Sequence, residues 1–166
     1  MALRNRLNFQ PGGVLVLGAT GNAGRLAVQI AKLLGAERVV GAGRSPERLH
    51  LLKDLGADAV VPLDGSGEEV TNMLGREAGD VDVVLDCLWG RPTEQAIPAI
   101  LIARTDRSKA LHWVQVGSMA SQGISLSSAF SVQATSTFWA AVRDPSVPTP
   151  SWPNCPRSPM KSAPAR

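Results

Sequence analysis

Tyrosine is absent from this 166-residue sequence, and cysteine, histidine and aromatic residues are scarce. Without tyrosine, the chain cannot use a phenol as the general acid or base of a reaction. The two cysteines, Cys87 and Cys155, form no metal or disulfide spacing, and with only His50 and His112 beside them they predict no zinc site. No apolar run approaches the roughly 20 residues of a membrane span, and residues 1–13 lack the apolar core of a signal peptide. The sequence therefore predicts a soluble, cytoplasmic protein without membrane contact.

A basic face is also missing from most of the chain, although the net charge is +3. Residues 1–129 contain 13 basic and 13 acidic residues, whereas residues 130–166 contain four basic residues and one acidic residue. The main body therefore has no excess of positive charge to attract a phosphate backbone. We expect no nucleic-acid partner.

What the sequence does contain is organised around residues 14–34, which predict a buried strand, a glycine turn and a long helix. Four consecutive apolar residues, Val14 to Leu17, suit a strand that is covered on both faces. Apolar residues then recur at helical intervals up to Leu34, and Gly35 stands where a helix often ends.

The turn between them has the spacing GxxGxxG and supplies the first predicted ligand site. Its residues are Gly18, Ala19, Thr20, Gly21, Asn22, Ala23 and Gly24. Such a turn aims free backbone N–H groups and the positive helix end at one point, which suits a pyrophosphate. Glycine is needed because a Cβ would crowd the turn, the ligand or the neighbouring strand. We therefore predict dinucleotide binding, with a ligand-free glycine turn as the alternative.

Strands and helices alternate along the rest of the chain. Further strands are predicted at residues 38–42, 57–61, 81–85 and 111–116, and helices begin at Pro46, after Ser66 and at Pro92. Ser45 is expected to cap the first of these helices with its hydroxyl, and Ser66 and Glu69 fit a capping box. Pro98 is expected to bend or shorten the helix at 92–103. This alternation predicts an α/β fold with a doubly wound parallel sheet of about five or six strands.

In such a sheet, ligands bind at the edge that the carboxyl ends of the strands form. NAD sites usually carry an acidic residue after the second strand, but here the sequence reads Ala42-Gly43-Arg44. Arg44, and Arg48 one helical turn later, can pair with a 2′-phosphate because a guanidinium matches phosphate oxygens. The sequence thus favours NADP(H) over NAD(H), and Asp64, after the third strand, is a candidate contact to the adenosine.

Four strings carry a resemblance to a known family: AVQIAKLLGAERVV, SPERLHLLKDLGADAVV, DVVLDCLWG and WVQVGSM. With the glycine turn, they resemble the Rossmann cofactor domain of medium-chain dehydrogenases/reductases, in their quinone-reductase-like and alcohol-dehydrogenase-like branches. The resemblance covers residues 1 to about 129. The runner-up, the short-chain dehydrogenase and epimerase group, has a similar GATG turn but uses a catalytic tyrosine, which this chain lacks.

The resemblance implies an oxidoreductase that transfers hydride between nicotinamide and a quinone, enone or carbonyl. The segments starting at Cys87-Leu88 and at Val116-Gly117-Ser118 would border the nicotinamide ribose. Full-length members carry a β-rich catalytic domain before the cofactor domain, and intact relatives are expected to form homo-oligomers. The sequence is therefore expected to be truncated at its N-terminus, with residues 1–13 as an entry segment, residues 14–129 as the dinucleotide-binding domain, and no catalytic residue of its own.

From residue 130 the composition changes, and residues 143–166 hold seven of the twelve prolines. We expect residues 130–166 to be non-native and to result from a frameshift after Ala129, because the neighbouring reading frame, with permitted codons, can encode a segment that resembles the family's continuation. Residues near 134–139 then form a makeshift sixth strand, and the chain beyond about 140 is disordered. Two alternative functions follow: a non-catalytic nucleotide-binding module with a proline-rich interaction tail, or a truncated gene product without function.

Overall fold

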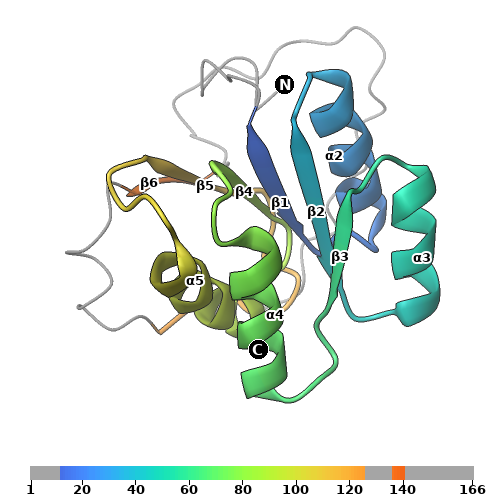
Figure 1. Ribbon diagram of the computed structural model, residues 1–166. Helices are drawn as coiled ribbons and strands as arrows, with labels where there is room; N and C mark the ends of the chain where they lie inside the picture. Colours follow the sequence, from blue (N-terminus) through green and yellow to red (C-terminus); the bar gives the residue numbers. More distant parts are fainter. Residues whose placement is uncertain (1–11, 126–135, 141–166) are drawn as a thin grey trace, which may run out of the picture.

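The computed structural model describes residues 12–125 and 136–140, which form a six-stranded sheet flanked by helices (Figure 1). In chain order the elements are β1 (Gly13–Leu17), α2 (Asn22–Leu33), β2 (Arg38–Gly43), α3 (Pro46–Asp54), β3 (Ala59–Pro62), α4 (Gly67–Ala78), β4 (Val83–Asp86), α5 (Arg91–Ala103), β5 (Leu111–Gln115) and β6 (Ser136–Ala140). The strand order is β3-β2-β1-β4-β5-β6, and all neighbouring strands are parallel. This is the order of a doubly wound Rossmann sheet, so the predicted fold class is confirmed.

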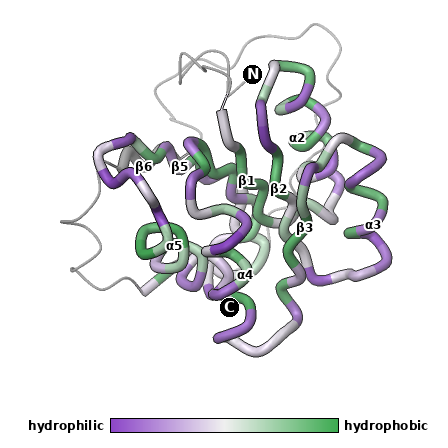
Figure 2. The backbone as a smooth tube through the Cα atoms, in the orientation of Figure 1, coloured by the Kyte–Doolittle hydropathy of each residue, from purple (hydrophilic) through white to green (hydrophobic). Residues whose placement is uncertain are grey.

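Each face of the sheet is covered by its own apolar layer. In β1, Leu15 and Leu17 pack with α4 and α5, whereas Val14 and Val16 pack with α2 and α3. All four side chains are fully buried, which explains why β1 is apolar at every position rather than at alternate ones. Figure 2 shows the apolar residues gathered on the strands and on the helix faces turned toward them.

The helix boundaries follow local signals in most places. The Ser66 hydroxyl accepts a hydrogen bond from the Glu69 amide at 3.3 Å, and the Glu69 carboxylate accepts one from the Ser66 amide at 2.9 Å. This confirms the predicted capping box. Gly35 and Gly56, which follow α2 and α3, have φ angles of +87° and +102° that side chains disfavour.

Two local predictions differ from the structure: the side-chain cap by Ser45, and the shortening of a helix that was one of the two effects expected of Pro98. Ser45 occupies the N-cap of α3, but its hydroxyl caps nothing there. Pro46 already fixes the first helical φ angle, and Pro46, Glu47 and Arg48 in the first turn are exposed, so their backbone does not depend on a side-chain cap. Pro98 does not shorten α5, because buried Ile97 and Ile100 on either side of it anchor the helix against the core. Tertiary packing offsets the hydrogen bond that proline removes.

The sixth strand, where a makeshift strand was expected, lies beside β5 at the edge of the sheet. Backbone positions 136–140 pair in parallel with Leu111–Gln115. The expected entry segment, apart from residues 12 and 13, and the expected disorder beyond about residue 140 lie outside the described residues. In the part of the chain that the structure describes, no helix combines the length and apolar character needed to cross a membrane.

Candidate functional site

The predicted site segments meet at the carboxyl edge of the sheet. The Gly18 and Ala19 amides both donate to the Ala42 carbonyl at 2.9 Å, which joins the end of β1 to the end of β2. The Cys87 amide donates to the Leu17 carbonyl at 3.1 Å and joins β4 to β1. A continuous rim of backbone therefore connects the glycine turn with its neighbours on both sides.

Each glycine of the turn has a separate role. Gly18 has a φ of +83°, so it needs the freedom that glycine has there. A Cβ on Gly24 would lie 2.6 Å from the Ala19 Cα, so only glycine lets α2 pack this closely onto the turn. A Cβ on Gly21 would meet only the Gly18 carbonyl oxygen, at 3.4 Å, which leaves space on the outer side of the turn.

The first turn of α2 presents unpaired backbone donors. The first helical hydrogen bond runs from the Arg25 amide to the Gly21 carbonyl at 2.9 Å, and no described acceptor takes the amide hydrogens of residues 22–24. Gly21 has no side chain to cap them, and the first turn contains no acidic residue. These donors and the helix dipole suit an anion, so the geometry fits the pyrophosphate of a dinucleotide.

The end of β2 lies against the same turn. A Cβ on Gly43 would come within 2.5 Å of the Thr20 Cγ2, so this glycine allows the two segments to touch. Arg44 and Arg48 are exposed beyond it, and neither guanidinium forms an ion pair or side-chain hydrogen bond with another described residue. Asp64, after β3, is exposed as well, and no contact joins it to these arginines.

The turn after β4 is held by one buried carboxylate. Asp86 is fully buried, and its Oδ1 accepts hydrogen bonds from the Leu88 and Trp89 amides, both at 2.9 Å. Its Oδ2 accepts from the Thr93 hydroxyl at 2.6 Å and from the Trp113 indole at 3.2 Å. Four donors from three segments thus fix the path of residues 87–90.

The predicted contacts Cys87 and Leu88 lie in this turn, next to the glycine turn. A Cβ on Gly18 would lie 3.0 Å from the Leu88 side chain and 3.3 Å from the Cys87 Cβ. Cys87 is buried, and burial, followed by the negative charge of Asp86, raises the pKa of its thiol. The thiol therefore stays protonated near neutral pH, where it is a poor nucleophile.

The segment after β5 closes the other side of the β4 turn. The Val116 and Gly117 amides donate to the Asp86 carbonyl at 2.7 and 3.1 Å. A Cβ on Gly117 would lie 3.1 Å from the Cys87 carbonyl oxygen. Val116 and Ser118 are exposed at this edge. The structure thus brings the predicted residues of β1, β2, β4 and β5 onto one rim, with Asp64 farther out beyond β3.

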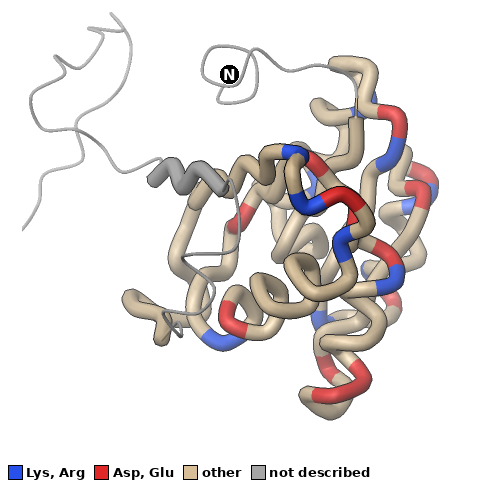
Figure 3. Tube along the Cα trace, turned by 60° about the vertical axis from the view of Figure 1, so that its left-hand side comes forward, with Lys and Arg blue, Asp and Glu red and all other residues tan. Residues whose placement is uncertain are grey.

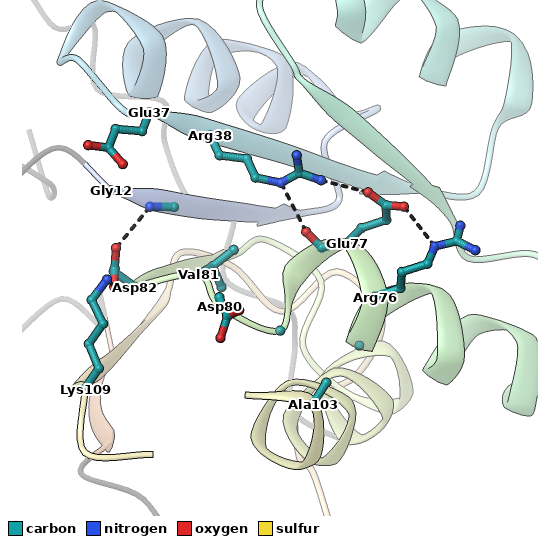
Figure 4. A pocket seen from close by; sticks show the side chains of 13 residues that line it. Gly12, Glu37, Arg38, Arg76, Glu77, Asp80, Val81, Asp82, Ala103 and Lys109 are labelled. Atoms are coloured by element: carbon teal, nitrogen blue, oxygen red, sulfur yellow. Dashed lines mark hydrogen bonds and ion pairs between the residues drawn. The ribbon is translucent and has the colours of Figure 1, made fainter. Parts of the chain in front are cut away.

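A hollow of about 880 Å³ lies at the opposite, amino-terminal edge of the sheet (Figure 4). Its charged groups pair with one another: Glu77 accepts from Arg38 at 2.8 Å and from Arg76 at 3.0 Å. Asp82 pairs with Lys109 at 2.6 Å and accepts from the Gly13 amide at 3.0 Å. Basic and acidic residues are interspersed along the described part of the chain trace (Figure 3). These paired groups stabilise loops and leave few free to hold a charged ligand.

Sequence reasoning missed two features of the site. It assigned no site role to Asp86, which fixes the β4 turn through Thr93 and Trp113. It also gave no role to Trp89, whose φ of +58° makes it the one side-chain-bearing residue with a left-handed backbone among those described. A tryptophan before a glycine carries no local signal for that conformation, so only the structure reveals it.

Comparison with known proteins places this fold in a family. A family model described as "Zinc-binding dehydrogenase" matches residues 23–102. In residues 12–125 and 136–140, no group of three or more His, Cys, Asp or Glu side chains is placed to hold a metal ion. The matched residues start at the end of the glycine turn and finish in α5, so they cover β2 and β4 of the site but not β1.

Individual relatives of this chain are reductases. A protein of Emericella nidulans named "Probable NADPH-dependent quinone reductase" is 35% identical over 131 residues, which is 72% of this chain and 34% of that protein. An acryloyl-coenzyme A reductase of Sulfurisphaera tokodaii is 40% identical over 80 residues, 48% of this chain and 22% of that protein. The chain thus spans about a third or less of these relatives.

A solved structure of an NAD-dependent alcohol dehydrogenase is 26% identical and superposes with a TM-score of 0.64. The alignment covers 83% of this chain and 38% of that one. The strand order, the glycine turn and these relatives agree. The chain therefore belongs to the medium-chain dehydrogenase/reductase family, of which it carries the Rossmann-type part.

Proposed function

We propose that residues 14–129 form a nicotinamide-dinucleotide-binding domain whose ligand lies across the carboxyl edge of the sheet. The observation that carries this proposal is the first turn of α2, where three backbone amides have no acceptor within residues 12–125 and 136–140 and glycine leaves room for one. The glycine turn, Gly18 to Gly24, would hold the pyrophosphate. Cys87, Leu88, Val116, Gly117 and Ser118 would border the nicotinamide half, and Asp64 the adenosine.

Arg44 and Arg48 support a preference for NADP(H) over NAD(H). Both are exposed beside Gly43, and neither guanidinium is engaged by another described residue, so both are available to a 2′-phosphate. The names of the relatives differ on this point, since one is called NADPH-dependent and a solved structure NAD-dependent. The preference therefore rests on the arginines and on the lack of an acidic residue after β2.

The activity we propose is that of a zinc-independent oxidoreductase acting on a quinone, enone or carbonyl compound. When bound, the nicotinamide supplies or accepts the hydride. The residues of this chain bind the dinucleotide, orient it on a rigid rim and exclude water from its buried side. We assign no catalytic residue to them. The quinone and acryloyl-coenzyme A reductases among the relatives support this substrate class.

The pyrophosphate site is tested by changing Gly21, whose φ of −81° and open surroundings tolerate a side chain. Gly21→Asp puts a good N-cap and a negative charge at the proposed anion site, so affinity for NADPH should fall about 100-fold while the unfolding temperature holds or rises. Gly21→Asn is the matched neutral control. Calorimetric titration that finds equal affinity for both variants would contradict a pyrophosphate at this helix end.

The preference for NADP(H) is tested by Arg44→Ala. Losing a guanidinium from an exposed phosphate should weaken NADPH binding about tenfold and leave NADH binding unchanged. Arg107→Ala, an exposed arginine after α5, serves as the control for a general loss of positive charge. Equal weakening of NADPH and NADH, or none for either, would refute the assignment.

A further inference from the structure

Trp89 is held in a backbone conformation that its side chain disfavours. Its φ is +58°, a region in which a bulky residue is a genuine outlier. Such strain persists only where the surroundings enforce it, and it gathers at functional sites. The enforcing group here is Asp86, whose buried carboxylate binds the Trp89 amide at 2.9 Å.

The next residues lock the turn from the other side. Gly90 has a φ of +71°, and a Cβ there would lie 2.6 Å from the Ser121 Cβ. The Ala120 amide donates to the Leu88 carbonyl at 2.7 Å. The segment after β5 therefore packs against the turn that Asp86 fixes. Within this turn, the Trp89 residue is partly exposed.

The turn after β4 lies where one half of a dinucleotide, bound across the sheet edge, would pass. Asp86 lies beside Leu17 of β1 on one side and Gln115 of β5 on the other. A ligand that crosses the switch point of the sheet has its adenosine half near β2, where Arg44 lies, and its other half over β4 and β5. Trp89 thus belongs to the half opposite Arg44.

We propose that Trp89 is a positioning residue for the nicotinamide half of the dinucleotide. This inference rests on the proposed function. The indole forms an aromatic wall at the end of β4, against which the nicotinamide ring is held. An indole face attracts heteroaromatic rings, and it attracts the positively charged oxidised nicotinamide through its π electrons. The strained turn serves to place that ring at the rim instead of in the core.

The test compares two ligands that share the adenosine half, NADP⁺ and 2′,5′-ADP, in calorimetric titrations of the full chain. Trp89→Asn tolerates a left-handed backbone but removes the ring, and Trp89→Phe keeps an aromatic ring. We expect Trp89→Asn to weaken NADP⁺ binding about tenfold and to leave 2′,5′-ADP binding within twofold of wild type. Trp89→Phe should remain within about threefold of wild type for both ligands.

Each outcome separates this inference from the proposed function. If wild type binds neither ligand, the proposed function fails and this inference fails with it. If wild type binds both but Trp89→Asn weakens both equally, Trp89 acts only through the fold of the turn. If Trp89→Asn binds NADP⁺ as tightly as wild type, the indole does not touch the ligand. Either of the last two results overturns the positioning role and leaves the dinucleotide site intact.

Discussion

The two edges of the sheet treat their polar groups in opposite ways. At the carboxyl edge, the first amides of α2 and the guanidinium groups of Arg44 and Arg48 have no acceptor among the described residues. At the amino edge, the Arg38, Glu77, Arg76 triad and the Lys109, Asp82 pair satisfy one another. The hollow at the amino edge is therefore a poor guide to a ligand site. The carboxyl edge fits an anionic ligand better, because its hydrogen-bond donors lack partners among the described residues.

The difference also appears in the backbone. Gly18, Trp89 and Gly90 at the carboxyl edge all have φ angles between +58° and +83°. Their conformations are enforced by hydrogen bonds and close packing rather than by local preference. Mutations that disturb these enforced conformations should therefore affect stability and ligand binding together, whereas mutations at the amino edge should affect stability slightly and binding not at all.

The largest effect is expected for Asp86→Ala. The change leaves the Thr93 hydroxyl and the Leu88 and Trp89 amides without their acceptor in a buried place, which costs about 3 kcal/mol or more of unfolding free energy. Asp86→Asn keeps one acceptor oxygen and should lose about half as much. Urea unfolding measures both. A loss below about 1 kcal/mol for Asp86→Ala would show that the carboxylate does not hold the turn.

The second largest loss of unfolding free energy is expected for Gly24→Val. Its side chain would overlap the Ala19 backbone and force α2 away from the turn, at a cost of about 2–3 kcal/mol. Gly21→Ala, three residues earlier in the same turn, is the control and should change stability by less than about 0.5 kcal/mol. Comparable losses for the two variants would mean that glycine is required for turn flexibility rather than for close packing.

At the amino edge, Arg38→Ala should have only a small effect. The Arg38 side chain is 48% exposed, and Glu77 keeps Arg76 as a partner after the change, so the loss is about 0.5 kcal/mol at most. Dinucleotide affinity should not change, because the pair lies at the other end of the strands. A weaker affinity for NADPH in this variant would break the proposed division between the edges.

The smallest effect concerns pH. Hydrogen bonds from the Thr105 amide, at 2.9 Å, and from its hydroxyl, at 3.0 Å, lower the pKa of Asp80 from its ordinary 3.8. Because the folded value is depressed, this contribution to stability is present above about pH 3.8 and is lost as the pH falls through the lowered value. Thr105→Val should raise the Asp80 pKa toward 3.8 in an NMR titration. An unchanged pKa would assign the shift to the Thr105 amide alone.

Local signals in the sequence were enough to predict the helices and strands and their order. Apolar runs such as Val14 to Leu17, the Ser66 and Glu69 capping box and the glycines after α2 and α3 act within a few residues, so their consequences are legible without the fold. Because parallel strands all end at one edge, the sequence also predicted that the glycine turn, Arg44 and Cys87 share a rim.

Features that depend on residues far apart in the chain could be seen only in the folded structure. Asp86 accepts a hydrogen bond from Trp113, which lies 27 positions later in the sequence. Gly90, after β4, packs closely against Ser121, after β5. The strained Trp89 follows from those contacts. Pro98 remains helical because Ile97 and Ile100 are buried. Local propensities fix where strands and helices form, but only packing decides which polar groups find partners and which stay free for a ligand.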